Sequence, residues 1–317
     1  MLSYTIQRLL QAIPVLLLTS LLIFVGLRLA PGDPADFLAG PNATPAQIEI
    51  VRHQLGLDQN YAAQYYIWID AVLHGNLGKS LINGLPVSQL LLDRMAATLQ
   101  LAASGFIAST MLGILLGLIS GLWPGTIIDR IVTFFSALGI SMPVFWSGML
   151  LIYLFGVEFR LFPVAGRVAF SQDPLAALKS LALPTLALAI GNAPIVARFL
   201  RDGIQDNRRA EHVRTAVAKG LPRWQITRDY VVRNSLIPVV TAAGAKLGNL
   251  IGGTALVEIV FSWPGIGSLL VDSMGNRDYG VVQAALLFAV LGFLFSNLLV
   301  DLLYGYLDPR VRHVQSA

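Results

Sequence analysis

The chain has 317 residues, of which 55% are hydrophobic and 13% are charged, and its formal net charge is +4. This composition excludes a disordered chain, and so few charges cannot cover the surface of an ordinary soluble domain. The sequence has no cysteine, which excludes a disulfide framework, a thiolate nucleophile and a cysteine-ligated metal centre. We therefore expect an all-α integral membrane protein.

Six apolar runs are long enough to cross a bilayer, and backbone polar groups in hydrocarbon require each of them to be a helix. The short alternating segments of a membrane barrel are missing from the sequence. The predicted spans are residues 9–27 within an N-terminal segment 1–29, then 95–122, 131–156, 180–198, 235–257 and 281–303.

The run at residues 9–27 has a second interpretation, a cleaved signal peptide that follows Arg8. Its apolar part is longer than the roughly 7–15 residues of a signal core, and no small-residue cleavage site follows. We expect an uncleaved first span.

The distribution of Lys and Arg predicts the orientation, because cytoplasmic loops carry the excess of positive charge. With the N-terminus inside, the inner segments hold 13 Lys and Arg and the outer segments hold 8. Nine of the inner ones lie between Arg198 and Arg233. Both termini, including the tail 307–317, are therefore expected in the cytoplasm.

The outer segment 30–94 is expected to form a small helical cap. Thr44 and Pro45 favour a helix start, and the helix should continue to Leu55 and stop at Gly56. A second helix is expected from about residue 61 to residue 73. The sequence leaves open whether this cap recognises anything or only packs as a lid.

The inner segment 199–234 is expected to form a helix, a turn and a second helix at the membrane surface. The first helix should run from Glu211 to Lys219, with Gly220 at its C-terminus and Pro222 in the first turn of the next. A basic amphipathic segment that only binds anionic lipid headgroups is the alternative. Amino-acid composition does not distinguish the helix–turn–helix structure from a segment that only binds lipid headgroups.

No motif argues for an enzyme. The run from Gly75 to Ser80 resembles the end of a phosphate-binding loop, but Leu73 occupies the position of its first glycine and no strand precedes it. No G-x-S-x-G motif and no metal-ligand spacing occur, so we expect no catalytic residue and no metal. The histidines are scattered at His53, His74, His212 and His313.

Two spans contain glycines at every fourth position, which lets another helix approach closely. Either internal packing or contact with a second subunit would use such a face. The two sets are Gly113, Gly117 and Gly121, and Gly244, Gly248 and Gly252.

Three polar residues inside or near spans are candidates for function, because such groups are costly in a bilayer. Lys246 lies in the fifth span, and Asn297 and Asp301 share one face of the sixth. A structural ion pair is an equal alternative for Lys246 and Asp301.

A series of short motifs resembles the permease subunits of bacterial ABC importers, in the group that takes up dipeptides, oligopeptides, nickel chelates or glutathione. The match extends from Met1 to about Arg312 and is most similar to the first of the two permeases in such systems. The motifs are Pro31-Gly32-Asp33-Pro34, Leu55-Gly56-Leu57-Asp58, the Gly75–Ser80 run, Ser141-Met142-Pro143 with Phe145-Trp146, Pro163-Val164-Ala165-Gly166-Arg167, Phe261-Ser262-Trp263-Pro264-Gly265, Arg277-Asp278-Tyr279, Asn297 through Asp301, and Asp308-Pro309-Arg310.

The cytoplasmic signature of that family, E-A-A-x-x-x-G, corresponds here to the stretch from Arg214 to Gly220, with the Glu and the first Ala replaced. Tyr230 stands where a histidine is common, which indicates a divergent member. The resemblance implies that the loop helix docks on an ATPase, with small residues allowing close approach. The implied coupling residues are Glu211, Arg214, Thr215, Ala216, Ala218, Lys219, Gly220, Leu221 and Pro222.

The resemblance implies a type I ABC importer permease fold, with a core at residues 95–306, in the cell inner membrane. It also implies a second homologous permease, two ATPase subunits that bind ATP and Mg, and an extracytoplasmic substrate-binding protein. Contact with membrane lipid is expected. Neither a nucleic-acid partner nor a cofactor bound to this chain is expected.

The expected function is ATP-driven import of short peptides by alternating access, or of nickel chelates or glutathione by the same machinery. A self-contained secondary transporter is the alternative from another class, but no matching pair of broken helices is evident. The sequence does not indicate the pathway residues, or whether the binding protein is periplasmic or lipid-anchored.

Overall fold

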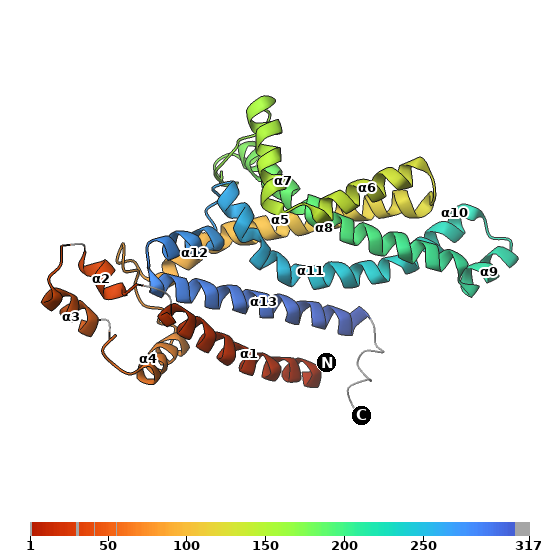
Figure 1. Cartoon of the computed structure of the whole chain (residues 1–317). Helices are drawn as coiled ribbons and strands as arrows, with labels where there is room; N and C mark the ends of the chain where they lie inside the picture. The colour runs from red at the N-terminus through yellow and green to blue at the C-terminus, as the bar shows by residue number, and fades with distance from the viewer. Residues whose placement is uncertain (1, 30–31, 41, 55, 308–317) are drawn as a thin grey trace. The chain divides into compact units, whose positions relative to one another are not determined.

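The computed structural model describes residues 2–29, 32–40, 42–54 and 56–307, with the side chains of 2–4, 34, 37, 38, 54, 241, 245–252, 301 and 303–307 left out. Its described residues are helical, apart from loops and one isolated bridge between Lys79 and Pro86 (Figure 1). The helices are α1 (Leu2–Leu29), α2 (Pro34–Ala39), α3 (Pro45–Gln54), α4 (Tyr61–Leu73), α5 (Val87–Leu122), α6 (Ile127–Ser141), α7 (Val144–Leu151), η1 (Ile152–Glu158), α8 (Pro174–Arg209), α9 (Glu211–Ala218), α10 (Arg223–Gln225), η2 (Ile226–Val232), α11 (Arg233–Val260), α12 (Ile266–Gly275) and α13 (Tyr279–Leu307).

The chain divides into two compact units. One unit comprises Met1–Thr98 and Pro264–Leu298, and the other comprises Leu99–Trp263 and Leu299–Ala317. Helices α5 and α13 each pass from one unit into the other.

The first unit has its core where the start of α5 meets α12 and the start of α13. The backbone N–H of Ile266, at the start of α12, donates to Thr98 Oγ1 on α5 over 2.8 Å. Helix α12 lies between the last two predicted spans and was not among the predicted elements. The buried core residues are Val87, Leu91, Ile266, Leu269, Val281, Ala284 and Ala285.

The cap helices agree with the sequence prediction. Helix α3 starts at Pro45, with Gln47 N–H donating to Thr44 Oγ1 over 3.4 Å, and Gly56 follows with a φ of +65°. Helix α4 has the expected bounds and is capped by Asn60, whose Oδ1 accepts from Ala63 N–H over 2.8 Å. A further short helix, α2, precedes them with Asp33 as its N-cap.

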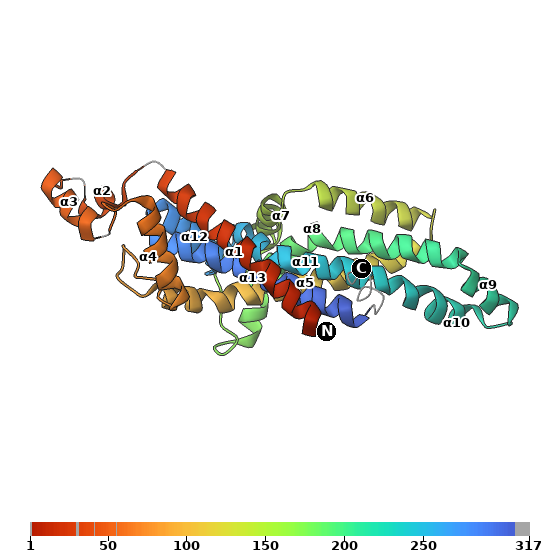
Figure 2. The ribbon, with the colours of Figure 1, turned by 90° about the horizontal axis from the view of Figure 1, so that it is seen from below.

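The second unit is built around α8, which contacts α6, α7 and α11. Helices α6 and α8 lie side by side in both ribbon views (Figures 1 and 2). In the most apolar stretch of α8, 56% of the residues are buried. Neighbouring helices therefore cover much of the surface of α8.

The third predicted span, 131–156, is not one straight helix. It is divided into α6 and the α7–η1 segment, which meet at a bend of 109°. Pro143 explains the bend, because a proline lacks the N–H that continues a helix and disfavours helical backbone in the residue before it. Met142 accordingly has extended backbone, with φ −86° and ψ 124°.

Within the described residues, four helices are long and apolar enough to cross a membrane, or five if the bent pair counts as one span. They correspond to the first, second, third, fourth and sixth predicted spans. The fifth, 235–257, falls within the 28-residue helix α11, where the side chains of 245–252 lie outside the description. The number of six membrane spans therefore remains a prediction.

Candidate functional site

The inner segment 199–234 forms the helix, turn and helix that the sequence predicts. Helix α9 runs from Glu211 to Ala218, one residue short of the expected end. Gly220 has a φ of +74°, which a residue with a Cβ adopts at a cost. Its N–H donates to Val217 O over 2.9 Å and that of Leu221 to Ala216 O over 3.3 Å, a Schellman motif. Pro222 then precedes α10.

One face of α9 is anchored in the core of the second unit. Val213 and Ala216 are three positions apart and are exposed by only 7% and 1%. They belong to one buried cluster with residues of α8, η2 and α11, against which α5 residues also pack. The cluster comprises Val196, Leu200, Ile204, Val213, Ala216, Ile226, Val231 and Val239.

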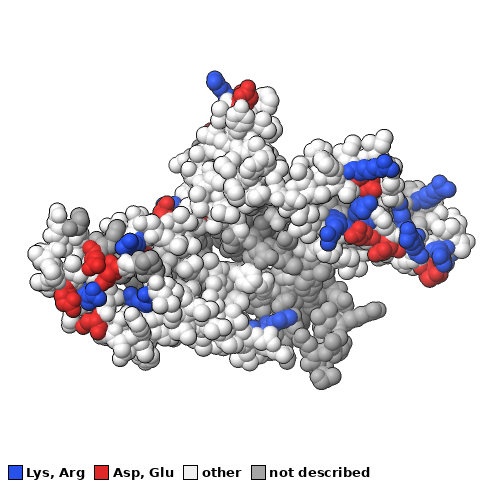
Figure 3. Space-filling model, viewed as in Figure 1, with Lys and Arg blue, Asp and Glu red and all other residues white. Residues whose placement is uncertain are grey.

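The opposite face of α9 is open. Val217 is 61% exposed, and Arg214, Thr215, Ala218, Lys219 and Gly220 are exposed as well. Arg214 donates to Glu211 Oε1 over 2.8 Å along this face. Figure 3 shows charged side chains gathered at the end of the unit that carries α9 and α10. Val217 is thus an exposed apolar side chain among charged ones.

The structure therefore separates the predicted coupling residues into two groups. The small side chain of Ala216 was expected to permit close approach by an ATPase, but it packs inside the chain. The exposed group contains Ala218 and Gly220, which leave room above the helix for a partner. Val217 lies within the Arg214–Gly220 signature but was not among the predicted coupling residues, although it is 61% exposed.

Hydrogen bonds connect the loop to the long helices. His212 Nε2 lies 3.2 Å from Tyr230 O, and Asn234 Nδ2 donates to the same carbonyl over 2.8 Å. Asn207 Nδ2, near the end of α8, donates to Ser235 Oγ on α11 over 3.2 Å. These bonds link α9 to η2, η2 to α11, and α11 to α8.

A second exposed group follows the turn. Trp224 is 62% exposed, and the guanidinium carbon of Arg228 lies 4.7 Å from its ring centroid. Arg228 also donates two hydrogen bonds to Asp229, over 2.7 and 3.0 Å, and lowers the pKa of that carboxyl. These side chains extend the open face of the loop.

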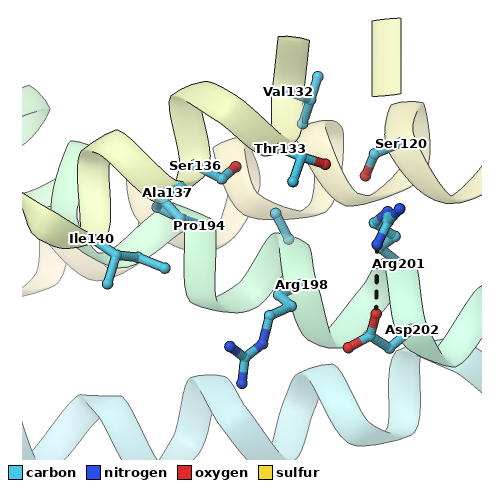
Figure 4. Close-up of a pocket in the computed structure, with 11 residues that line it drawn as sticks. Ser120, Val132, Thr133, Ser136, Ala137, Ile140, Pro194, Arg198, Arg201 and Asp202 are labelled. Atoms are coloured by element: carbon cyan, nitrogen blue, oxygen red, sulfur yellow. Dashed lines mark ion pairs between the residues drawn. The ribbon is translucent and has the colours of Figure 1, made fainter. Parts of the chain in front are cut away.

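A cavity of about 230 Å³ lies between α5, α6 and α8 near this loop (Figure 4). Thr133 and Ser136 of α6 line one side, and Arg198 and Arg201 of α8 line the other. Arg201 donates to Asp129 through Nε and Nη2 over 2.9 and 3.1 Å, which links α6 to α8. We assign the cavity no ligand.

The glycines of α5 pack against α8 of the same chain. A Cβ on Gly113 would lie 2.7 Å from Ala193 O, and one on Gly117 would lie 2.8 Å from Ala197 O. A Cβ on Gly121 would lie 2.8 Å from Ile204 Cδ1. This face is therefore occupied within the chain and is not free for a second subunit.

Other predicted residues are only partly described. Gly244, Gly248 and Gly252 all lie in α11, but the surroundings of Gly248 and Gly252 and the side chain of Lys246 lie outside the description. Asn297 is partly buried on α13, and the side chain of Asp301 lies outside the description.

The run that resembles a phosphate-binding loop has a structural role. Ser80 Oγ donates to Asp278 Oδ2 over 2.5 Å, and both residues are buried. A serine bound to a carboxylate in this way does not face a phosphate. No group of three potential metal ligands occurs among the described residues.

Comparison with known families gives two matches that together cover most of the chain. Residues 113–313 match the family described as "Binding-protein-dependent transport system inner membrane component". Residues 1–102 match the corresponding N-terminal family, "Binding-prot-dependent transport system membrane comp, N-term".

Similar curated proteins cover the chain from end to end. A "Glutathione transport system permease protein GsiC" from Salmonella choleraesuis (strain SC-B67) is 39% identical over 313 residues, covering 99% of this chain and 100% of the relative. A "Probable peptide ABC transporter permease protein y4tP" from Sinorhizobium fredii (strain NBRC 101917 / NGR234) is 37% identical over 310 residues, covering 98% and 99%.

Two solved structures share the fold. An inward-facing crystal form of the MetNI methionine ABC transporter has a TM-score of 0.57 at 19% identity, over 69% of this chain and 97% of that one. An amino acid ABC transporter crystallised with histidines has a TM-score of 0.55 at 16% identity, over 69% and 94%.

Proposed function

Because the chain belongs to the family of binding-protein-dependent transport system inner membrane components, we propose that it is half of the path through which an ATP-driven importer takes up short peptides. The chain is a multi-pass permease subunit of an ABC importer in the inner membrane and not an enzyme.

The proposed topology has six spans with both termini in the cytoplasm. The fifth span is residues 235–257, within α11. The excess of Lys and Arg between Arg198 and Arg233 supports a cytoplasmic position for the inner loop. The cap formed by α2, α3 and α4 is then extracytoplasmic.

The open face of α9 is the proposed docking surface for an ATPase subunit. The observation that supports this proposal is that α9 is buried on one face only: Val213 and Ala216 are held in the core while Val217 is exposed. A partner bound to the open face moves a helix that is itself anchored to α8, η2 and α11. Motion of the partner thereby becomes motion of the spans.

ATP and Mg bind to the ATPase subunits and not to this chain. Closure of two such subunits would draw α9 with them and shift the permease from an inward-facing to an outward-facing arrangement. The Schellman turn at Gly220 and the following Pro222 hold the angle between α9 and the next helix. A rigid angle transmits displacement rather than absorbing it.

The proposed assembly contains a second homologous permease, two ATPase subunits and an extracytoplasmic substrate-binding protein. The glycine face of α5 is used within the chain, so the second permease must contact other surfaces. Exposed apolar side chains on α6, including Phe134 and Phe135, are available for a partner helix or for lipid.

Short peptides are the proposed substrate class, with glutathione and nickel chelates as alternatives. One relative is a permease of a glutathione transport system and another of a probable peptide transporter, at 39% and 37% identity. These two sequence identities are too similar to show whether the substrate of this chain is a peptide or glutathione. A self-contained secondary transporter is disfavoured by membership of this family.

The coupling proposal is tested by reconstituting the complete importer in vesicles and substituting the open face. We expect Val217→Asp to abolish ATP-driven uptake of a labelled dipeptide and to reduce co-purification of the ATPase. Ser171→Asp places the same charge in the exposed loop before α8 and should leave both unchanged. Glutathione and a nickel chelate, added as competitors, identify the preferred substrate.

Full uptake by the Val217→Asp importer would overturn the docking surface. Uptake by the isolated chain without any ATPase would overturn the proposed mechanism as a whole.

A further inference from the structure

Trp224 is a large apolar side chain that no described part of the chain covers. It is 62% exposed, and with Val217 at 61% it is the most exposed of the large apolar side chains in the described inner segment 199–234. Val217 belongs to α9, whereas Trp224 belongs to α10, after the turn at Gly220. The docking surface proposed on α9 therefore does not account for Trp224.

The Trp224 ring is held in place by its own segment. The guanidinium carbon of Arg228 lies 4.7 Å from the ring centroid, within the range of a cation–π contact. Arg228 is fixed in turn by two hydrogen bonds to Asp229, over 2.7 and 3.0 Å. The segment itself is anchored in the core, because Ile226 and Val231 are only 7% and 2% exposed and belong to the buried cluster. The ring is thus preorganised on a fixed support, which lowers the entropic cost of binding a partner.

In the proposed topology Trp224 lies beyond the lipid headgroups. Helical backbone continues from α10 through η2 into α11, with φ and ψ of −59° and −49° at Ile226 and −57° and −44° at Arg233. Trp224 precedes the start of the fifth span at residue 235 by about 11 residues, which is about 15 Å at a rise of 1.5 Å per residue. The headgroup layer on each side of a bilayer is about 5–8 Å thick. Lipid therefore does not cover the ring.

A second exposed tryptophan of the same unit lies at a different depth. Trp123 is 54% exposed and follows directly after α5, whose last residue is also the last of the predicted second span. In the proposed topology that is the level at which tryptophans meet the headgroups. Both ribbon views show α9 and α10 farther along the direction of α8 than the connection between α5 and α6 (Figures 1 and 2). The two tryptophans should therefore have different partners.

The charge of the loop indicates the chemistry of a partner for Trp224. The stretch from residue 198 to residue 233 contains nine Lys and Arg but only four Asp and Glu. Arg223, the residue before Trp224, is exposed. A complementary surface has an apolar pocket for the ring and carboxylates at the rim of that pocket. Tryptophan and arginine are also the residues that most often dominate the binding energy of an interface.

We propose that Trp224 inserts into an apolar pocket, bordered by acidic side chains, on the ATPase subunit. This contact is separate from the open face of α9 and lies on the other side of the Gly220 turn. Arg228 is a positioning residue, because it holds the ring through the cation–π contact. The inference rests on the proposed function, since it requires an ATPase bound to this loop.

The first test places the photoreactive aromatic residue p-benzoylphenylalanine at position 224 of the complete importer, with a tagged ATPase subunit, in native membranes. Irradiation should join the permease to the tagged ATPase. The same replacement at position 123 is the matched control, and its main adduct should be with lipid. An adduct from position 224 with lipid alone or with the second permease alone would overturn the proposal. An ATPase yield from position 224 no greater than that from position 123 would also overturn it.

The second test titrates ATPase subunits onto the permease pair in lipid nanodiscs. We expect Trp224→Ala to weaken ATPase binding by at least about tenfold, as for an interface hot spot, and Trp224→Phe to retain most of the affinity. Arg228→Ala should have a smaller effect, and Arg228→Lys, which keeps a cation near the ring, should restore most of it. Trp123→Ala should bind like the wild type. An unchanged unfolding midpoint for Trp224→Ala checks that this variant is folded.

Wild-type affinity in folded Trp224→Ala would overturn the proposal. If Val217→Asp loses the ATPase while Trp224→Ala keeps it, the docking surface on α9 stands and the Trp224 contact alone is wrong. A wild-type permease pair that binds no ATPase would instead mark failure of the proposed function.

Discussion

Ser80 Oγ donates to Asp278 Oδ2 over 2.5 Å, although 198 residues separate them in the chain. The same oxygen accepts from the N–H groups of Ile82 and Asn83, over 3.2 and 3.3 Å. One buried serine therefore shapes the turn before α5 and connects it to the residue that precedes α13. Two of the motifs behind the family resemblance meet at this bond.

Removal of the hydroxyl should destabilise this turn. Ser80→Ala leaves Asp278 buried with an unsatisfied oxygen, which costs about 1–3 kcal/mol. We expect a lower midpoint in thermal unfolding of the purified complex. Ser88→Ala, at an exposed position in the first turn of α5, is the matched control and should have little effect. Equal midpoints for the two variants would show that the Ser80 bond contributes nothing.

The ion pair between Asp129 and Arg201 should contribute more to the free energy of unfolding than the ion pair between Asp202 and Arg201. Asp129 is buried and also accepts from Gly125 N–H over 2.9 Å. Asp129→Ala leaves Arg201 without its closest partner, and because Arg201 is partly exposed we expect a loss of about 2–3 kcal/mol, less than for a fully buried pair. Asp202 lies 3.9 Å from Arg201 and is largely exposed, so Asp202→Asn should cost under about 1 kcal/mol. Denaturant unfolding of the two variants measures the difference, and a greater loss for Asp202→Asn would contradict the assignment.

A methyl group on the glycine face of α5 should separate that helix from α8. Gly117→Ala places a Cβ 2.8 Å from a backbone oxygen of α8, and overpacking of this kind costs about 1–3 kcal/mol. A Cβ on Gly26 of α1 meets nothing within 4 Å, so Gly26→Ala is the control. Thermal unfolding should show a lower midpoint for Gly117→Ala alone. An unchanged unfolding midpoint for Gly117→Ala would mean that α5 and α8 are packed less closely than the structure shows.

The orientation can be tested directly because the chain has no cysteine of its own. Val217→Cys and Ser171→Cys introduce single thiols at exposed positions of the same unit. With the inner loop in the cytoplasm, a membrane-impermeant maleimide applied to intact cells should label Ser171→Cys and not Val217→Cys. Permeabilised cells should show labelling of both. The reverse pattern would invert the proposed topology.

Much of the local structure follows from the sequence. The starts of α3 at Pro45 and of α4 at Tyr61 depend on neighbouring capping residues, and the end of α9 depends on Gly220. These are interactions between residues a few positions apart, so their pattern is visible in the linear chain. The apolar runs predict long helices for the same reason, because a bilayer-length stretch has one stable backbone arrangement.

Which face of each helix is covered by another part of the chain was decided by the tertiary structure alone. Ala216 and Val217 are adjacent, yet one is buried and the other is open. The glycines of α5 contact α8, Ser80 bonds to Asp278, and Arg28 shares a pocket with Arg52. Helical spacing shows which residues share a face but not what covers it, because the partner is far away in the chain. The 109° bend shows the same limit: the sequence was interpreted as one continuous span at residues 131–156, and although Pro143 accounts for the break, its angle depends on how the helices on either side pack.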